Sequence, residues 1–345
     1  MKTPTWVVLF AALALHARAD APAFIEQLAV KAAHAEASDV SVVRGEDGWL
    51  FFAPELRSMG VGRFWSDAAA DVSRAPKPEY ADPLPAILDF HAQLDGAGIE
   101  LIFVPVPAKA VIYPDAIADG VDVDDGEIPR LDAYHQEFYA VLRERGVRVL
   151  DLAPVYLEHR RAANTDLYCR QDTHWSGQGL RIAADEIARV IRDGGWVNDT
   201  RTHEYDAGAL DTRITGDLWT QLGDAGLEKE SLRLLRVGPT AAAPQTWTNN
   251  EWRESPVLLL GDSHCLVFHE GGDMHARGAG LPDHLAARLG FPTDVVGVRG
   301  SGATPSRLAL FRRRDSLKGK RVVVWCLSVR EFTEGQGWRE VPVIR

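Results

Sequence analysis

The chain has 345 residues, of which 46% are hydrophobic and 25% charged, and its formal net charge is −11 at pH 7. Because phosphate binding depends on basic surface, this balance argues against nucleic acid as a partner and disfavours adhesion to anionic lipid. A chain of this size can bury a sizeable core.

The N-terminus has the pattern of a cleavable secretory leader over residues 1–19. Lys2 gives a basic start, an apolar stretch follows at 6–15, and Ala-Arg-Ala at 17–19 is a small-x-small cleavage site. The apolar stretch is shorter than the ~20 residues that a membrane-spanning helix needs. We therefore expect export of residues 20–345, with an uncleaved anchor as the alternative.

Strands and helices are expected to alternate along the mature chain. In chain order, the predicted elements are a helix at 21–38, a turn and strand within 42–52, a helix at 84–97, a strand at 99–106, a helix at 129–145, a strand at 147–152, a helix at 176–192, a strand at 257–260, a helix at 281–289, and strands at 294–298 and 321–327. Continuous apolar runs such as 99–106 are typical of strands buried on both faces. The alternation predicts an α/β fold with a doubly wound, mostly parallel sheet between two layers of helices.

Two stretches interrupt this alternation. Residues 53–82, with several prolines, indicate a long irregular segment over the sheet edge. Residues 200–255 are mixed and polar, and 239–250 are expected to form a loop.

Three cysteines are an odd number for an oxidising compartment, so at most one pair can form. Cys169 and Cys265 each lie close to one of the motifs described next, and a bridge between them is a hypothesis. Cys326 lies in an apolar run and is expected to be a buried small hydrophobe.

Two short motifs carry the most specific chemical signal. They are Gln-Asp-Thr-His-Trp at 171–175 and Gly-Asp-Ser-His at 261–264, which supply Asp172, His174 and Ser263. A serine hydroxyl becomes a nucleophile when an imidazole accepts its proton, and a carboxylate orients that imidazole. Because the serine follows a predicted strand, it should lie at the carboxyl edge of the sheet, where ligands bind in such folds.

Less specific interpretations exist for both motifs. Each could simply cap the helix or turn that follows it. A metal centre is a further alternative, with His174, His264, His269 and His275 available. Zinc sites usually need three protein ligands in fixed geometry, and no His-x-x-x-His pair on one helix face occurs, so we expect no metal and no cofactor. His269 and His275 are interpreted as loop residues.

The motifs together resemble a known family. Gly-Asp-Ser with a distant Asp-x-His-Trp is similar to the SGNH hydrolase superfamily, and especially to its alginate O-acetyltransferase branch, the AlgX/AlgJ-like proteins. The blocks that carry the resemblance are Gly-Glu-Asp-Gly-Trp-Leu-Phe at 45–51, Val-Pro-Val-Pro-x-Lys-x-x-Ile-Tyr-Pro at 104–114, the segment 171–180, and Gly-Asp-Leu at 216–218. The likeness covers roughly 42–330. As in that branch, Asp-x-His precedes the serine, whereas ordinary SGNH esterases have the opposite order.

One feature of the superfamily is missing, namely its usual oxyanion asparagine block. Its place could be taken by Val-Arg-Gly-Ser-Gly at 298–302, where Arg299 resembles the family's arginine and Gly300 offers a main-chain N–H. A simple loop is the alternative for this segment.

Three further residues are candidates for substrate binding. Lys109 and Tyr113 lie just beyond the carboxyl end of a predicted strand, and Trp175 could stack on a sugar ring. The alternatives are a solvated Lys109, a Tyr113 packed against the sheet, and a core role for Trp175.

The resemblance implies a periplasmic O-acetyltransferase that acetylates an exported, alginate-like polysaccharide through Ser263, with His174 as base and Asp172 orienting it. It also implies a membrane-bound acyltransferase partner as acetyl donor, with export-complex proteins as further partners. We expect a single domain over 20–345 without a C-terminal carbohydrate-binding module. A carbohydrate acetyl esterase that uses the same residues and a non-catalytic glycan-binding subunit are the alternatives.

Overall fold

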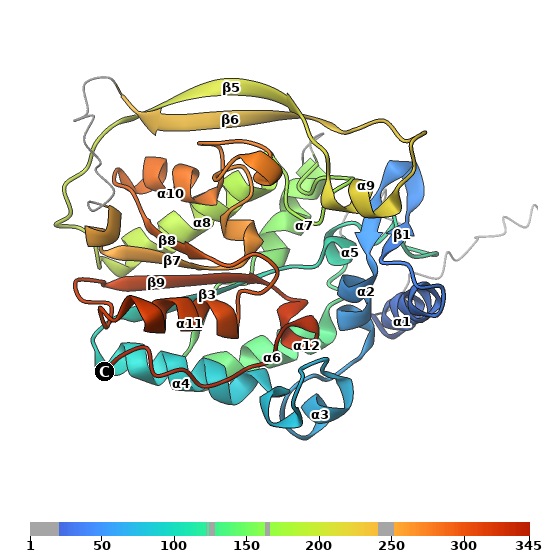
Figure 1. The fold of residues 1–345 in the computed structure, drawn as a ribbon, viewed down its shortest axis with the longest axis horizontal. Helices are drawn as coiled ribbons and strands as arrows, with labels where there is room; N and C mark the ends of the chain where they lie inside the picture. Colours follow the sequence, from blue (N-terminus) through green and yellow to red (C-terminus); the bar gives the residue numbers. More distant parts are fainter. Residues whose placement is uncertain (1–20, 122, 124–127, 163–165, 241–251) are drawn as a thin grey trace, which may run out of the picture.

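The computed structural model describes residues 21–121, 123, 128–162, 166–240 and 252–345 (Figure 1). The predicted leader at 1–19 and most of the loop expected at 239–250 lie outside these residues. Within the described ranges, no helix combines the length and the hydrophobicity needed to cross a membrane.

A five-stranded parallel sheet forms the centre, with strand order β4-β3-β9-β7-β8. Its strands are β3 (Glu100–Val106), β4 (Arg148–Val149), β7 (Val257–Gly261), β8 (Asp294–Gly297) and β9 (Val322–Ser328). Every residue of β7 and β9 is buried. Continuous apolar runs form such strands because helices cover both faces of the sheet, and the predicted doubly wound sheet is confirmed.

Helices lie on both sides of this sheet, α8 and α10 on one and α4, α6 and α11 on the other (Figure 1). The described α-helices are α1 (Ala21–Ala37), α2 (Ala53–Gly60), α3 (Ala69–Val72), α4 (Pro83–Gly96), α5 (Lys109–Ile112), α6 (Ala133–Glu144), α7 (Ala153–Ala162), α8 (Gly177–Gly194), α9 (Asp217–Leu222), α10 (Leu281–Leu289), α11 (Thr304–Arg313) and α12 (Glu331–Glu334). Helix α8 begins after Ser176, whose hydroxyl accepts hydrogen bonds from the main-chain N–H groups of Gln178 and Gly179. It therefore starts directly after the Asp-x-His motif, as predicted.

The two stretches that interrupt the predicted alternation contain regular structure. Residues 53–82 include α2 and α3, and 200–255 include an antiparallel hairpin of β5 (Tyr205–Arg213) and β6 (Ser231–Pro239). The hairpin arches over α8 and α10 (Figure 1). A second, shorter hairpin pairs β1 (Val42–Arg44) with β2 (Leu50–Phe52).

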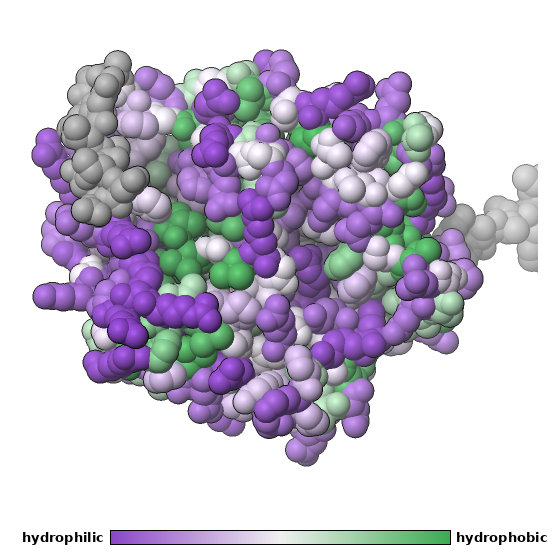
Figure 2. All heavy atoms as spheres, in the orientation of Figure 1, coloured by the Kyte–Doolittle hydropathy of each residue, from purple (hydrophilic) through white to green (hydrophobic). Residues whose placement is uncertain are grey.

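A continuous hydrophobic core includes residues from Phe24 to Val343, so the ends of the described chain pack on the same interior. On the face drawn in Figure 2, polar side chains predominate and hydrophobic ones gather in a few limited areas.

The sheet brings three chain segments to one edge. Parallel strands end at the same side, so the residues after β3, β7 and β9 lie close together. These residues include Lys109, Ser263 and Arg330. The candidate site is built at this edge.

Candidate active site

Ser263 lies in the sharp turn that follows β7. A Cβ atom on Gly261 would lie 1.7 Å from the carbonyl oxygen of Cys326, so only glycine fits where the strand ends. Asp262 then caps the short 3-10 turn η5 (Ser263–Cys265), because its carboxylate accepts a hydrogen bond of 2.8 Å from the main-chain N–H of His264. The serine is thus presented at the predicted edge of the sheet.

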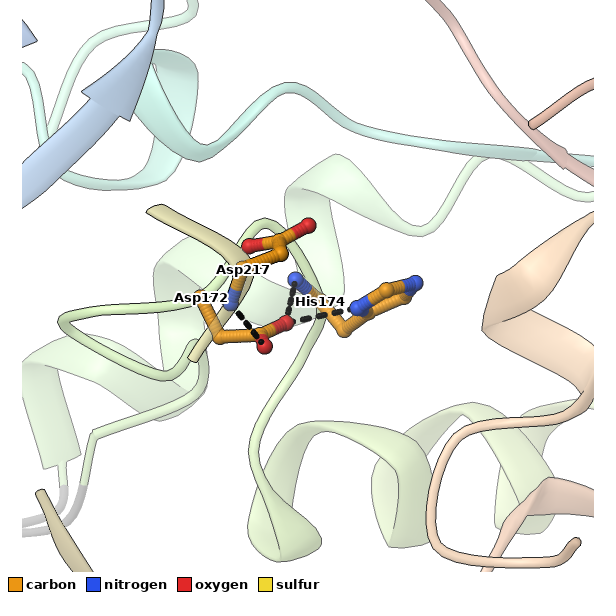
Figure 3. A group of neighbouring side chains, drawn as sticks. All are labelled: Asp172, His174 and Asp217. Atoms are coloured by element: carbon orange, nitrogen blue, oxygen red, sulfur yellow. Dashed lines mark hydrogen bonds and ion pairs between the residues drawn. The ribbon is translucent and has the colours of Figure 1, made fainter. Parts of the chain in front are cut away.

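Asp172 and His174 lie in the loop before α8, and Figure 3 shows the carboxylate directed at the imidazole. Asp172 Oδ1 accepts hydrogen bonds from the main-chain N–H of His174 (3.0 Å) and from its Nδ1 (2.6 Å). A neighbouring turn packs closely on this loop, since a Cβ atom on Gly216 would lie 2.0 Å from the carbonyl oxygen of Gln171. The Asp-x-His loop is therefore packed tightly against this turn.

The two motifs meet at the serine. Ser263 Oγ lies 2.7 Å from Nε2 of His174. Because Nδ1–H faces Asp172, Nε2 is the acceptor for the serine hydroxyl proton. Asp172, His174 and Ser263 are 1%, 5% and 6% exposed. The structure thus brings the three sequence-predicted residues together in the order that nucleophilic catalysis requires.

The protonation states of the pair suit this chemistry. Burial would raise the pKa of Asp172, but the charge and hydrogen bond of His174 and a hydrogen bond from His275 hold it well below its usual range. Burial also disfavours a charged His174, yet the charge and hydrogen bond of Asp172 raise the pKa of His174 above its ordinary value. Asp172 is therefore the ionised partner of a strengthened base.

Two charged residues anchor the Asp-x-His loop. Lys109 Nζ donates to the carbonyl oxygens of Asp172 (2.6 Å) and Leu50 (2.9 Å). The carboxylate of Asp217 accepts from the main-chain N–H (2.8 Å) and the hydroxyl (2.6 Å) of Thr173. Lys109 is 1% exposed, so its interpretation as a substrate-binding residue and the alternative of a solvated side chain are both wrong. Its ammonium group holds the loop instead.

The two aromatic candidates are buried as well. The Tyr113 hydroxyl accepts a hydrogen bond of 2.7 Å from the main-chain N–H of Leu167, and its ring stacks on Trp49. Trp175 is fully buried and meets the ring of His264 edge-on. The interpretation of Trp175 as a platform for a sugar ring is wrong, because no face of the indole reaches solvent. Tyr113 likewise packs in the interior.

Arg299 is engaged by two carboxylates at the surface. Its guanidinium forms ion pairs of 2.6 Å with Asp273 and 2.8 Å with Glu270, and its side chain is 46% exposed. The assignment of Arg299 as an oxyanion residue stays a prediction, and these ion pairs do not favour it, because two surface carboxylates hold its charge.

The loop that carries Arg299 does reach the nucleophile turn. The main-chain N–H of Val298 donates to the carbonyl oxygen of Gly261 (2.9 Å), and a Cβ atom on Gly302 would lie 2.6 Å from the nitrogen of Asp262. Gly300 has φ +82° and no heavy atom within 4 Å of the position of a Cβ. The contact with the nucleophile turn is thus made by Gly302, two residues beyond the predicted Gly300.

A different arginine lies at the site. Arg330 follows β9, and its Nη1 atom is buried without a hydrogen-bond partner in the described part of the chain. Its guanidinium lies 5.6 Å from the ring centroid of Phe52. Its positive charge contributes to lowering the pKa of Asp262 and opposes the rise in the pKa of His174, so it acts on both motifs. Sequence reasoning missed Arg330, although its position after a predicted strand was an available signal.

A second histidine also contacts the carboxylate. His275 Nε2 lies 3.0 Å from Asp172 Oδ2. The sequence interpretation placed His275 only in a loop. The preceding Gly271-Gly272 pair indicates a turn, but nothing in the local sequence indicates this contact.

Asp172, His174 and Asp217 offer ligand atoms within 4.8 Å of one another, a spacing that would also suit a metal ion (Figure 3). The carboxylates of Asp172 and Asp217 already accept hydrogen bonds from other groups of the protein. Asp172 Oδ2 accepts from the main-chain N–H of Asp217 (2.9 Å) and from His275, and both oxygens of Asp217 accept from Thr173. These bonds favour positioning and proton transfer, rather than metal binding, as the role of the three residues.

The cysteines are not bridged. Cys169 Sγ is directed at the carbonyl oxygen of Trp175 (3.5 Å), and Cys265 Sγ at that of Cys326 (3.6 Å). All three cysteines are free and buried. The hypothesis of a bridge between Cys169 and Cys265 is therefore wrong for this structure.

A parallel sheet with a serine turn and an Asp-x-His loop at its carboxyl edge defines an SGNH hydrolase-like domain. The chain belongs to the family described as "SGNH hydrolase-like domain, acetyltransferase AlgX", which matches residues 42–329. The resemblance inferred from the sequence motifs is confirmed.

Curated relatives are similar in sequence to part of this chain. A "Probable alginate O-acetylase AlgJ" from Pseudomonas aeruginosa is 29% identical over 187 residues, which are 53% of this chain and 39% of the relative. A protein of the same name from Pseudomonas fluorescens is 26% identical over 234 residues, 65% of this chain and 53% of the relative. The matched regions thus span about half or less of these relatives.

Solved structures agree in fold. The O-acetyltransferase domain of Pseudomonas putida AlgJ superposes with a TM-score of 0.62 at 21% identity, over 85% of this chain and 92% of that domain. Pseudomonas aeruginosa AlgX gives a TM-score of 0.56 at 16% identity, over 84% of this chain and 62% of AlgX.

Proposed function

We propose that this protein is an O-acetyltransferase that moves acetyl groups onto hydroxyls of an exported, alginate-like polysaccharide through an acetyl ester on Ser263. The observation that carries the proposal is the 2.7 Å contact between Ser263 Oγ and His174 Nε2, in a chain of an acetyltransferase family. The relatives named as probable alginate O-acetylases support the choice of acceptor.

The first half-reaction loads the serine. His174 Nε2 accepts the hydroxyl proton while Ser263 Oγ forms a bond to the acetyl carbonyl carbon of the donor. The carbonyl electrons move to oxygen and then return, the bond to the donor oxygen breaks, and His174 passes its proton to that leaving group. Asp172 remains ionised and orients the imidazole, which leaves neutral His174 beside the acetyl ester.

The second half-reaction uses a sugar hydroxyl. The hydroxyl gives its proton to His174 Nε2 as its oxygen attacks the acetyl carbonyl, and the bond to Ser263 Oγ then breaks. His174 returns the proton to Ser263 Oγ. The products are an acetylated sugar and the free enzyme, so atoms and charge balance.

Negative charge develops on the carbonyl oxygen in both steps and needs a donor. We assign this role to Arg330, which follows β9 at the same sheet edge as Ser263. Its buried Nη1 donates to no acceptor in the described part of the chain. A single preorganised donor of this kind typically contributes about 3–4 kcal/mol to transition-state stabilisation.

The donor, the partners and the location belong to the same proposal. Acetyl-CoA is cytoplasmic, whereas the leader at 1–19 directs the chain to the periplasm. We infer that a membrane-bound acyltransferase delivers the acetyl group and that export-complex proteins bring the polysaccharide.

The test uses purified mature protein with p-nitrophenyl acetate as donor and alginate oligosaccharides as acceptor, followed by mass spectrometry of both. We expect acetylated wild-type protein and acetylated oligosaccharide, and neither with Ser263→Ala. Full acetyl transfer by Ser263→Ala would refute the mechanism.

Two other outcomes separate the alternatives. If the acetyl group appears only as free acetate in the presence of oligosaccharide, water is the acceptor and the protein is an esterase. If Ser263 fails to react with a sulfonylating reagent, the chain is a non-catalytic subunit.

A further inference from the structure

His275 is the fourth donor on the carboxylate of Asp172. That carboxylate accepts from the main-chain N–H of His174 (3.0 Å), His174 Nδ1 (2.6 Å), the main-chain N–H of Asp217 (2.9 Å) and His275 Nε2 (3.0 Å). Two donors bind each oxygen, so all the lone pairs of the carboxylate are engaged. The contacts of His275 complete this set.

The backbone at His275 has a strained conformation, in which the side chain contacts Asp172. His275 has φ 69° and ψ −53°, and the main-chain N–H of Ala276 donates to the carbonyl oxygen of Met274 at 2.9 Å. This is the rare form of the γ-turn, a conformation that residues with a Cβ seldom adopt. Such strain persists only where surrounding structure imposes it, and it concentrates at functional sites.

The surrounding loop imposes the conformation from two sides. The carbonyl oxygen of Met274 also accepts from the main-chain N–H of Phe268 (2.8 Å), and the ring of Phe268 lies 5.8 Å from that of His275. The side chain of His275 is only 9% exposed. The imidazole is therefore packed as well as hydrogen-bonded.

The loop also ties His275 to the nucleophile. The main-chain N–H of Val267 donates to the carbonyl oxygen of Ser263 at 2.9 Å, and Phe268 follows directly. One segment thus supplies the serine at its start and the second histidine at its end. The side chains form a continuous series from Ser263 through His174 and Asp172 to His275.

We propose that His275 is a positioning residue for acyl transfer, which holds Asp172 Oδ2 through Nε2–H so that Oδ1 faces His174. This inference rests on the function proposed above. Without His275, Oδ2 keeps only the main-chain N–H of Asp217, so the carboxylate holds His174 less firmly in its orientation toward Ser263. The lost donor also leaves Asp172 more basic, which strengthens its hold on the His174 proton.

The test compares His275→Gly with His275→Gln in the mature protein. Glycine removes the imidazole and relieves the positive φ, so the variant should melt at the wild-type temperature or above it. Glutamine restores an N–H donor close to the position of Nε2. The readout is the rate at which a sulfonyl fluoride modifies Ser263, followed by intact mass, because this rate needs no acetyl donor or acceptor.

We expect the modification rate of His275→Gly to fall about tenfold to a hundredfold, with partial recovery in His275→Gln. The acid limb of the rate should move to higher pH in His275→Gly, because the pKa of His174 rises. The other groups around the pair, namely Lys109 from α5, Asp217 from α9, His264 from η5 and Arg330 after β9, are unchanged in both variants. The shift therefore reports on His275.

His269→Gln is the matched control, since His269 lies on the same loop and pairs with a different carboxylate, Asp283, at 2.9 Å. It should react at the wild-type rate. Wild-type reactivity in His275→Gly would overturn the inference, as would a slower rate with an unmoved acid limb and a lower melting temperature. If wild-type Ser263 itself does not react, the proposed function fails instead.

Discussion

Two corners of the molecule share one local design and differ in chemistry. In Asp172-Thr-His174 and in Asp262-Ser-His264, the main-chain N–H of the histidine donates to Oδ1 of the aspartate, at 3.0 and 2.8 Å. In both, the histidine Nδ1 lies against the same oxygen, at 2.6 and 3.0 Å. Yet the pKa of His174 is raised and the pKa of His264 is lowered.

The surroundings explain the difference. Burial lowers the pKa of His264, Asp262 opposes this only in part, and the neighbouring His174 and Arg330 lower it further. At His174, burial also disfavours the charge, but the shorter bond to Asp172 and a contribution from Asp217 prevail. An Asp-x-His motif therefore does not by itself identify a base, because the charges around it set the protonation state.

Replacing each histidine by glutamine should give the largest difference in activity between the two corners. We expect His174→Gln to lower the rate of acetyl transfer at least about 10⁴-fold, because the serine loses its proton acceptor. His264→Gln should stay within about tenfold of wild type and melt at a lower temperature, because it disturbs a buried contact. Initial rates and thermal melts of both variants check this. Equal losses of rate would mean that both corners take part in the chemistry.

The aspartates give the next largest contrast. Asp172→Asn should lower the rate about 10³- to 10⁴-fold, because an amide favours the wrong tautomer of His174. Asp262→Asn should mainly lower the free energy of unfolding, by about 1–3 kcal/mol, since Asp262 accepts from both His264 and the main-chain N–H of Ser328 and an amide has one acceptor. Rates and urea unfolding distinguish the two. If Asp172→Asn lost stability and kept its rate, Asp172 would have the structural role that we assign to Asp262.

Arg330 acts on both corners, and Arg299 serves as its matched control. Arg330→Met should lower the rate about 10²- to 10³-fold through loss of the oxyanion donor. Arg299→Met should stay within about twofold, because exposed ion pairs with Glu270 and Asp273 contribute little. Steady-state rates with a small acetyl ester check both, and circular dichroism confirms folding. A larger loss in Arg299→Met would return the oxyanion role to that residue.

The pH dependence is the finest test of the contrast. His174 is active when neutral, so kcat/KM should rise with pH through a midpoint above the ordinary histidine value of 6.5. NMR titration of His264 should give a midpoint below 6.5. Because the unfolded chain protonates near 6.5 and native His264 does not, this residue makes stability fall as the pH drops below 6.5. If both midpoints fell on the same side of pH 6.5, the two histidines would not differ in the way we describe.

The central sheet could be predicted from the sequence because its strands are buried on both faces. The apolar runs at 99–106 and 257–260 correspond to β3 and β7 within one residue at either end. The hairpin of β5 and β6 could not be predicted in this way. Most of β5 is exposed, so its sequence lacks the apolar alternation of a half-buried strand.

At the site, the chemical motifs were informative and the side-chain directions were not. Asp172, His174 and Ser263 could be selected because each supplies a needed functional group. Lys109 and Trp175 lie close to the expected edge in sequence, but their side chains point into the interior, which sequence position does not reveal. His275 reaches Asp172 across a tertiary contact that has no local signature.

Strand β9 sets the order in which the parts of this protein can be assembled. It is the last described strand, yet it lies between β3 and β7, and the main-chain N–H of Ser328 at its end donates to Asp262 beside the nucleophile. A nascent chain that has emerged only to residue 321 already contains Asp172, His174 and Ser263, but its two half-sheets have no strand to join them. We therefore expect that the two halves of the sheet, and the site residues that follow their strands, are joined only once β9 has been inserted between β3 and β7.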